Sequence, residues 1–129
     1  MFRDVVVVDV SGSFSTEMKS VSVSVGENAT FSCMSDSPVN WQRQLFSSDK
    51  TESERICYGA EIMDGFKDEF AINIDRSAPT PVYELVVLSA DKDDAGEYTC
   101  IEDTGLGASV SANLTVHGKV WVILFCAVA

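Results

Sequence analysis

The feature that most constrains the fold is a seven-residue segment late in the chain, taken together with two residues far upstream. The segment, Asp94–Cys100, reads Asp-x-Gly-x-Tyr-x-Cys. A second cysteine, Cys33, lies 67 positions before Cys100, and Trp41 follows Cys33 by eight positions. These residues lie in segments where apolar and polar side chains alternate, which is the period of a β-strand with one buried face. The chain is thereby constrained to a fold whose strands carry these side chains in the interior.

The same alternation recurs along most of the chain and predicts at least seven short strands. Turn-forming residues separate the strands, among them Gly26 and Asn28 early in the chain and Pro79 and Pro81 later. No segment has a helical period of useful length. This pattern predicts an all-β sandwich of two packed sheets. The predicted strands cover residues 21–25, 29–33, 39–44, 56–58, 70–75, 82–87, 98–101 and 110–116.

Size and charge exclude several classes of partner. The chain has 129 residues, enough for one domain with its own core. Its formal net charge is −11, from 20 acidic and 9 basic residues. Nucleic acid and anionic lipid headgroups are poor partners for such a chain, because both need a basic surface. A basic protein surface remains a suitable partner.

No catalytic or cofactor-binding constellation is visible. The four cysteines show no Cys-x-x-Cys spacing and His117 is the single histidine, so we expect no zinc site and no other cofactor. No nucleophile–base pair stands out, and we expect the protein not to be an enzyme. Asp91, Asp93, Gly96 and Glu102 match positions 1, 3, 6 and 12 of a calcium loop, but position 5 is an alanine and no helices flank it. We interpret this segment as a loop that leads into a strand.

These residues resemble the immunoglobulin superfamily, and within it the variable-type (V-set) domains. Asp94–Cys100 is a close match to the family motif, and Trp41-Gln42-Arg43-Gln44 looks like Trp-Tyr-Arg/Gln-Gln. Ile56-Cys57-Tyr58 and Asn113-Leu114-Thr115-Val116 look like two further strands of the family. The resemblance covers roughly residues 11–117. It implies an immunoglobulin-like β-sandwich of the variable type, with two antiparallel sheets and Greek-key connections.

The resemblance also implies structural roles for the residues of the motif. Cys33 and Cys100 would form the disulfide between the sheets, with Trp41 and Tyr98 in the core. Asp94 would pair with a basic residue just before the strand that begins near residue 70, but Glu69 stands there. We expect Lys67 or Arg76 to replace that residue, or the ion pair to be missing.

In variable-type domains the sheet of strands G, F, C and C′ is the usual partner surface, and the resemblance implies the same here. The alternation turns Ile101 outward as an exposed apolar anchor. The loops at residues 35–39 and 103–107 adjoin that face. Leu114 lies seven residues after Gly107, which is too far for the joining segment of an antigen receptor, so the resemblance does not extend to rearranging antigen receptors. The predicted partner-binding residues are Gln42, Gln44, Thr99, Ile101, Asp103 and Leu106, with Asn40 also on the outward side.

Two sequons point to a secretory setting. They are Asn28-Ala29-Thr30 and Asn113-Leu114-Thr115. Together with the implied disulfide they favour an oxidising compartment and a glycoprotein on the extracellular side of the plasma membrane, or a secreted form. A glycan on Asn113 would shield part of the partner face and direct a partner toward the loops. No export signal opens the chain, so we interpret the sequence as a fragment.

The two ends and two cysteines leave alternatives open. Residues 1–10 contain a valine run that is either a first edge strand or an N-terminal extension. Residues 118–129 include ten consecutive apolar residues, about half the length of a membrane span. This tail is either the start of a transmembrane helix or an extra strand or vector-derived extension, and a lipid-anchor signal is less favoured. Cys57 is either a buried small residue or a partner in another bridge, and Cys126 lies in the tail.

The function we expect is protein recognition by surface complementarity, in immune-type recognition or cell adhesion. Homophilic adhesion through the same face is an alternative. A structural spacer domain in a longer chain is another.

Overall fold

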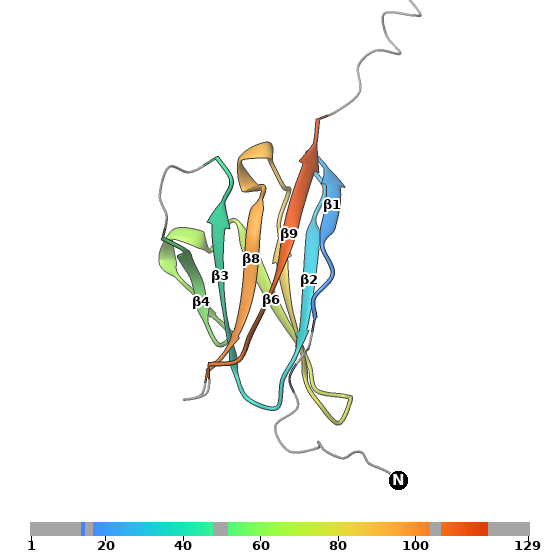
Figure 1. Ribbon diagram of the computed structural model, residues 1–129, viewed down its shortest axis with the longest axis vertical. Helices are drawn as coiled ribbons and strands as arrows, with labels where there is room; N and C mark the ends of the chain where they lie inside the picture. Colours follow the sequence, from blue (N-terminus) through green and yellow to red (C-terminus); the bar gives the residue numbers. More distant parts are fainter. Residues whose placement is uncertain (1–13, 15–16, 48–51, 104–106, 119–129) are drawn as a thin grey trace, which may run out of the picture.

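The computed structural model describes residues 14, 17–47, 52–103 and 107–118, and within them the chain forms a β-sandwich (Figure 1). Two single turns of 3₁₀ helix, η2 (Asp64–Phe66) and η3 (Lys92–Asp94), connect strands. None of the described helical segments is long or apolar enough to span a bilayer. The strands are β1 (Val21–Ser24), β2 (Ala29–Met34), β3 (Val39–Leu45), β4 (Glu54–Tyr58), β5 (Glu61–Ile62), β6 (Phe70–Asp75), β7 (Val82–Val87), β8 (Gly96–Glu102) and β9 (Ser109–His117).

The strands form one sheet of six and one of three. The six-stranded sheet has the order β1-β9-β8-β3-β4-β5, and the three-stranded sheet has the order β2-β7-β6. β9, β8, β3 and β4 correspond to the G, F, C and C′ strands of a variable-type domain, and the addition of β4 and β5 to this sheet is the feature that defines the type. The predicted variable-type sandwich is confirmed. The chain crosses between the sheets from β1 to β2, from β2 to β3, from β5 to β6 and from β7 to β8.

One strand pair departs from the expected antiparallel arrangement. β1 runs parallel to β9, with Val21 opposite Leu114 and Val23 opposite Val116. β1 is consecutive with β2 but belongs to the other sheet, where it pairs with β9 and forms the edge of the six-stranded sheet. Every other described pair within the two sheets is antiparallel.

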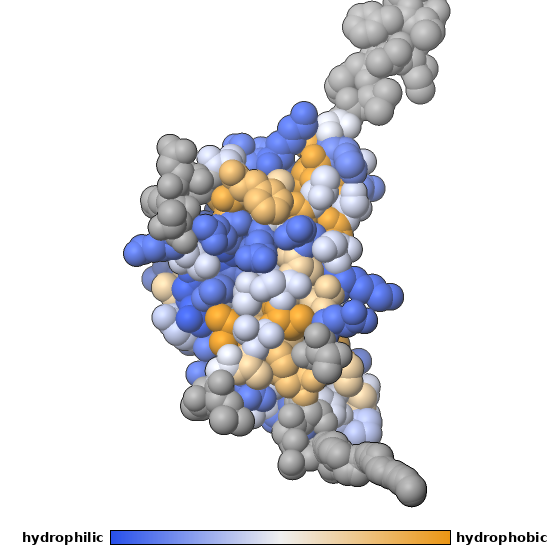
Figure 2. Space-filling model, viewed as in Figure 1, coloured by the Kyte–Doolittle hydropathy of each residue, from blue (hydrophilic) through white to orange (hydrophobic). Residues whose placement is uncertain are grey.

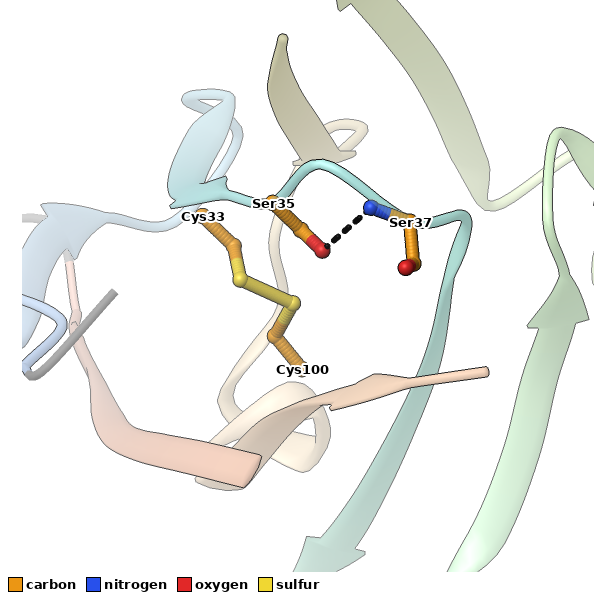
Figure 3. Close-up of a disulfide and its surroundings, with 4 residues drawn as sticks. All are labelled: Cys33, Ser35, Ser37 and Cys100. Carbon is orange, nitrogen blue, oxygen red and sulfur yellow. Dashed lines mark hydrogen bonds between the residues drawn. A yellow bond between two sulfur atoms is a disulfide. The ribbon is translucent and has the colours of Figure 1, made fainter. Parts of the chain in front are cut away.

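The core lies between the sheets and follows the predicted alternation. Trp41 and Tyr98 are fully buried, and the Tyr98 ring stacks on Phe31 with centroids 5.0 Å apart. The Cys33–Cys100 disulfide joins β2 to β8, and therefore links the two sheets as the resemblance implied (Figure 3). The disulfide and the buried aromatic rings therefore stabilise the same layer, the core between the two sheets.

Gly96, the glycine of the sequence motif, is required by a close approach of two backbones. It pairs with Leu45 across β8 and β3. A Cβ at this position would lie 2.5 Å from the carbonyl oxygen of Gln44. The glycine therefore permits β8 to pair with β3 from its first residue.

The main departures from the predicted elements lie between residues 46 and 69. β4 begins at Glu54, inside the segment expected to be a loop. The two-residue β5 and the 3₁₀ turn η2 occupy a segment without a clear prediction, because elements this short show no periodicity. The predicted N-terminal valine run and most of the apolar tail, with Cys126, lie outside the described residues.

Candidate functional site: the outer face of the six-stranded sheet

The register of β3, β8 and β9 places four of the predicted partner-binding residues, Gln42, Gln44, Thr99 and Ile101, in rows across one face. We call the solvent-facing side of these three strands the outer face. Its rows join Gln44 to Glu97 and Asn113, Gln42 to Thr99 and Ser111, and Asn40 to Ile101 and Ser109.

The outer face is predominantly polar. The hydroxyls of Thr99 and Ser111 are hydrogen-bonded at 2.7 Å across β8 and β9. Gln42, Gln44 and Thr99 are half-buried by their neighbours, and Asn113 is exposed. Figure 2 shows a hydrophilic band across the middle of this face, with hydrophobic groups above and below it.

Ile101 is the apolar residue at the centre of a polar row. It lies between Asn40 and Ser109, and it is half-buried. It does not belong to the hydrophobic core or to the apolar side chains packed against that core. Its outward orientation agrees with the prediction, and its side chain is half-buried rather than fully exposed.

Asn40 was predicted to be exposed on the outer face, and this is wrong. Its side chain is 6% exposed, and its Oδ1 accepts a hydrogen bond from the backbone N–H of Gly59 at 2.9 Å. Gly59 has a φ of 61° and follows β4, which pairs with β3 alongside Asn40. Asn40 therefore holds the turn after β4 rather than a partner.

Two loops adjoin the outer face at the same end, as expected. The backbone N–H of Asp103, which is exposed, donates to the carbonyl oxygen of Pro38 at 2.8 Å. In the preceding loop, the hydroxyl of Ser35 accepts from the backbone N–H of Ser37 at 3.0 Å, and Figure 3 shows this bond beside the disulfide. Leu106 lies outside the described residues.

The cation that pairs with Asp94 is Arg43, and neither Lys67 nor Arg76 takes this role. Arg43 is only 6% exposed, and its Nη1 lies 3.2 Å from Oδ1 of Asp94. Its Nε lies 3.2 Å from Oε1 of Glu54, and Nη2 lies 4.0 Å from Oε1 of Glu69. Lys67 instead pairs with Asp64 at 3.2 Å. The cation therefore lies on β3 instead of at position 69. The ion pair with Asp94 is kept, and the guanidinium also lies near the carboxylates of Glu54 and Glu69.

Arg43 also connects the ion pairs to the aromatic core. Its guanidinium lies 5.3 Å from the ring centre of Phe66 and 5.2 Å from that of Phe70. Burial by itself would lower the pKa of Arg43, but hydrogen bonds and charge interactions with Tyr98 and Glu54 hold this pKa above its ordinary value. Arg43 is therefore a permanent cation within the sandwich.

Tyr98 forms the tyrosine corner that the motif implied. Its hydroxyl donates to the backbone carbonyl of Asp94 at 2.6 Å and accepts from Nη1 of Arg43 at 3.3 Å. Burial raises the pKa of Tyr98 to about 12. Its neutral hydroxyl is thus a structural hydrogen-bonding group.

Asp91, considered above as a calcium ligand, forms a capping box with Asp94 around η3. Oδ1 of Asp91 accepts from the N–H of Lys92 at 2.7 Å, and Oδ2 of Asp94 accepts from the N–H of Asp91 at 2.8 Å. The described residues contain no group of three or more His, Cys, Asp or Glu side chains suited to holding a metal ion.

Cys57 is a free thiol in the core and is fully buried. Burial raises its pKa to about 11. Among the alternatives left by the sequence, the structure supports a buried small residue.

The sequence analysis missed two exposed aromatic residues beside the outer face. Phe46, directly after β3, is 61% exposed, and Tyr58, at the end of β4, is 57% exposed. The guanidinium of Arg55 lies 4.9 Å from the ring centre of Tyr58. Each aromatic residue stands at the end of a predicted strand. A large apolar residue at such a position is the sequence signal that could have indicated an exposed aromatic side chain.

The two sequon asparagines lie in different environments. Asn28 is exposed in the turn before β2, and its Oδ1 accepts from the backbone N–H of Ser89 at 2.9 Å. Asn113 is exposed on the outer face.

Comparison with known proteins agrees with this geometry. The family model described as immunoglobulin domain matches residues 19–111. No curated protein matches the sequence. Among solved structures, the chain is similar to the RIG-5 IG1 homodimer, with a TM-score of 0.67 and 14% identity, covering 84% of this chain and 98% of that chain.

Two complexes contain further domains of similar fold. The structure of Dpr11 IG1 bound to DIP-gamma IG+IG2 gives a TM-score of 0.66 with 16% identity, covering 84% of this chain and 52% of that chain. The structure of Dpr1 IG1 bound to DIP-eta IG1 gives a TM-score of 0.64 with 15% identity, covering 85% of this chain and 99% of that chain. At these identities the similarity establishes the fold. Because the family model matches most of the chain, the protein belongs to the immunoglobulin domain family.

Proposed function

We propose that this immunoglobulin domain is the extracellular recognition module of a cell-surface receptor, acting in immune-type recognition or cell adhesion. It binds a protein partner through the outer face and the adjoining loops. The observation that carries the proposal is the position of Ile101. An apolar side chain that does not pack on the core lies on the middle strand of a polar face, at the end that adjoins the loops, which is the composition of a protein interface with an apolar anchor.

The solved structures of similar fold support a partner of the same kind. The Dpr and DIP structures are complexes between immunoglobulin domains, and the RIG-5 structure is a homodimer. A second immunoglobulin domain is therefore the partner class that we favour. The RIG-5 homodimer also supports the second candidate function, homophilic adhesion through the same face.

The charge of the chain adds a requirement for the partner. The formal net charge is −11, and Glu97 and Asp103 are exposed on or beside the outer face. A partner with a basic rim around an apolar centre complements this surface. Raising the salt concentration should slow association, because exposed charges are screened.

The remaining assignments follow from the same proposal. The recognition domain spans residues 11–117, and residues 118–129 begin a transmembrane segment that tethers it. The proposed contact residues on the outer face are Gln42 and Thr99, one row from the anchor, and Gln44, two rows from it. Asp103 and Leu106 belong to the adjoining loop. Asn28 and Asn113 carry N-linked glycans, in keeping with an extracellular location.

The test is a binding screen combined with a measurement of self-association. Glycosylated residues 11–118 are examined by light scattering behind size exclusion over a wide concentration range, and then against a panel of cell-surface immunoglobulin ectodomains. A saturable complex with one ectodomain supports heterophilic recognition, and a dimer that grows with concentration supports homophilic adhesion. A monomer that binds no member of the panel would favour a spacer domain and contradict the proposal.

A further inference from the structure

A shallow hollow lies at the end of the outer face away from Asp103. It has a volume of about 350 Å³ and is lined by Gln44, Leu45, Phe46, Glu97 and Asn113. Figure 2 shows a hydrophobic group at the upper end of this face, above the hydrophilic band. The hollow thus combines an aromatic wall with polar side chains.

Phe46 forms the aromatic wall of the hollow and is held there by the backbone. Its N–H donates to the carbonyl oxygen of Ala95 at 3.1 Å, which continues the pairing of β3 with β8 by one residue. The side chain is 61% exposed, the largest exposure among the large hydrophobic residues of the described chain. An aromatic ring fixed in this position presents an apolar surface for another group to cover.

Asn113 forms the opposite wall and belongs to a sequon. Glu97 separates it from Gln44 in one row across β9, β8 and β3. Thr115, two residues later on the same strand, is also exposed, so both functional residues of the sequon face solvent. Any group attached to Nδ2 of Asn113 begins at the rim of the hollow.

We propose that an N-linked glycan on Asn113 packs its first sugar into this hollow against Phe46. The inference rests on the proposed extracellular location. The donor is an oligosaccharide carried on a lipid pyrophosphate. Nδ2 of Asn113 bonds to C1 of the first N-acetylglucosamine, the bond from C1 to the pyrophosphate oxygen breaks, and the amide gives up one proton as the lipid pyrophosphate leaves. The C–H face of the sugar covers the Phe46 ring, and its hydroxyls meet the Glu97 carboxylate.

This arrangement divides the outer face into two functional parts. Ile101 is four residues along β8 from Glu97, about 14 Å at the rise of a strand. The glycan therefore covers the Phe46 end and leaves the end with Ile101 and Asp103 open for a protein partner. The exposed aromatic ring serves the glycan and is not a second anchor for the partner.

The test compares two matched threonine substitutions. Thr115→Ala removes the sequon at Asn113, and Thr30→Ala removes the sequon at Asn28. Both threonines are exposed on strands. Thr30→Ala also keeps the hydrogen bond that the Asn28 side chain accepts from the backbone N–H of Ser89. The full chain and its variants are produced behind a secretion leader in animal cells. Glycan occupancy is read by mass spectrometry and thermal unfolding by intrinsic fluorescence. We expect Thr115→Ala to lower the melting temperature by about 4 °C and Thr30→Ala to change it much less.

Phe46→Ala completes a double-mutant cycle with Thr115→Ala. If the sugar packs on the ring, the loss caused by Thr115→Ala should nearly vanish when Phe46 is already alanine. An unoccupied Asn113 in the secreted protein, or a loss that is the same with and without Phe46, would overturn the inference. These outcomes differ from failure of the proposed function, which shows as absent partner binding whatever the state of Asn113.

Discussion

Replacing Arg43 by methionine should destabilise the domain strongly, although its side chain is buried inside the sandwich and does not belong to the outer face. The change removes the cation that faces Asp94, Glu54 and Glu69, and leaves their carboxylates near one another. Removing one member of a buried ion pair typically costs about 3–5 kcal/mol. The acid side chains remain 18%, 39% and 50% exposed, so hydration relieves part of the repulsion and favours the lower end of this range.

The expected loss for Arg43→Met is therefore about 3 kcal/mol, with loss of the guanidinium contacts to Phe66 and Phe70 included. For a domain of this size such a loss lowers the melting temperature by about 12 °C or more. The assay is thermal and urea unfolding followed by tryptophan fluorescence at pH 7. Arg55→Met is the matched control on the neighbouring strand, because Arg55 stacks on the exposed ring of Tyr58 and should cost less than about 1 kcal/mol.

A second-site variant tests whether a cation at another position can replace Arg43. Glu69→Arg combined with Arg43→Met removes one acid and returns a cation to the position implied by the family resemblance. The double variant should recover at least half of the stability lost by Arg43→Met. Equal stability of the Arg43→Met and Arg55→Met variants would refute the account of the buried ion pair.

Three further outcomes follow from the core. Gly96→Ala should cost about 1–3 kcal/mol in urea unfolding, whereas Gly65→Ala, with open space around it, should be nearly neutral; equal effects would refute the close approach of β8 and β3. Burial raises the pKa of the Cys57 thiol to about 11, so its contribution to stability is present below about pH 9 and is lost as the pH rises through 11, at a cost on the order of 3 kcal/mol. Cys57→Ala should remove that part of the alkaline decline in stability, and an unchanged decline would contradict the assignment. Cys33→Ser opens a loop of 67 residues worth about 4 kcal/mol and should prevent secretion, so normal secretion would show that the disulfide is dispensable.

The sandwich could be predicted because one face of each strand is buried, whereas the disulfide was implied by the resemblance to immunoglobulin domains. Phe31, Cys33, Leu85 and Tyr98 recur at the period of a strand, and a shift of one residue would turn each of them toward solvent. The spacing of the motif then identified the type of sandwich. The two-residue β5 escaped prediction because so short a strand has no detectable period.

The site was less predictable, because alternation shows on which side a residue lies and not what covers it. Asn40 lies on the side assigned to it, yet the turn that follows β4 buries it. The alternation of this strand places Arg43 on the same side as Trp41, and a charge on an inward side is itself a signal of a buried ion pair. The resemblance implied a cation next to β6, so Lys67 and Arg76, which flank that strand, were expected in place of Arg43.

The measurement that tests the central claim most directly is the affinity of an Ile101→Asp variant for the partner found in the ectodomain screen, or for itself. Val86→Asp is the matched control, because Val86 is also half-buried, lies outside the core and faces solvent from the three-stranded sheet. A charge placed in the centre of an interface should weaken binding by at least about tenfold, while the same change on the other sheet leaves it unchanged. Both variants should melt at similar temperatures. Unchanged affinity for Ile101→Asp, or an equal loss for Val86→Asp, would contradict recognition through the outer face.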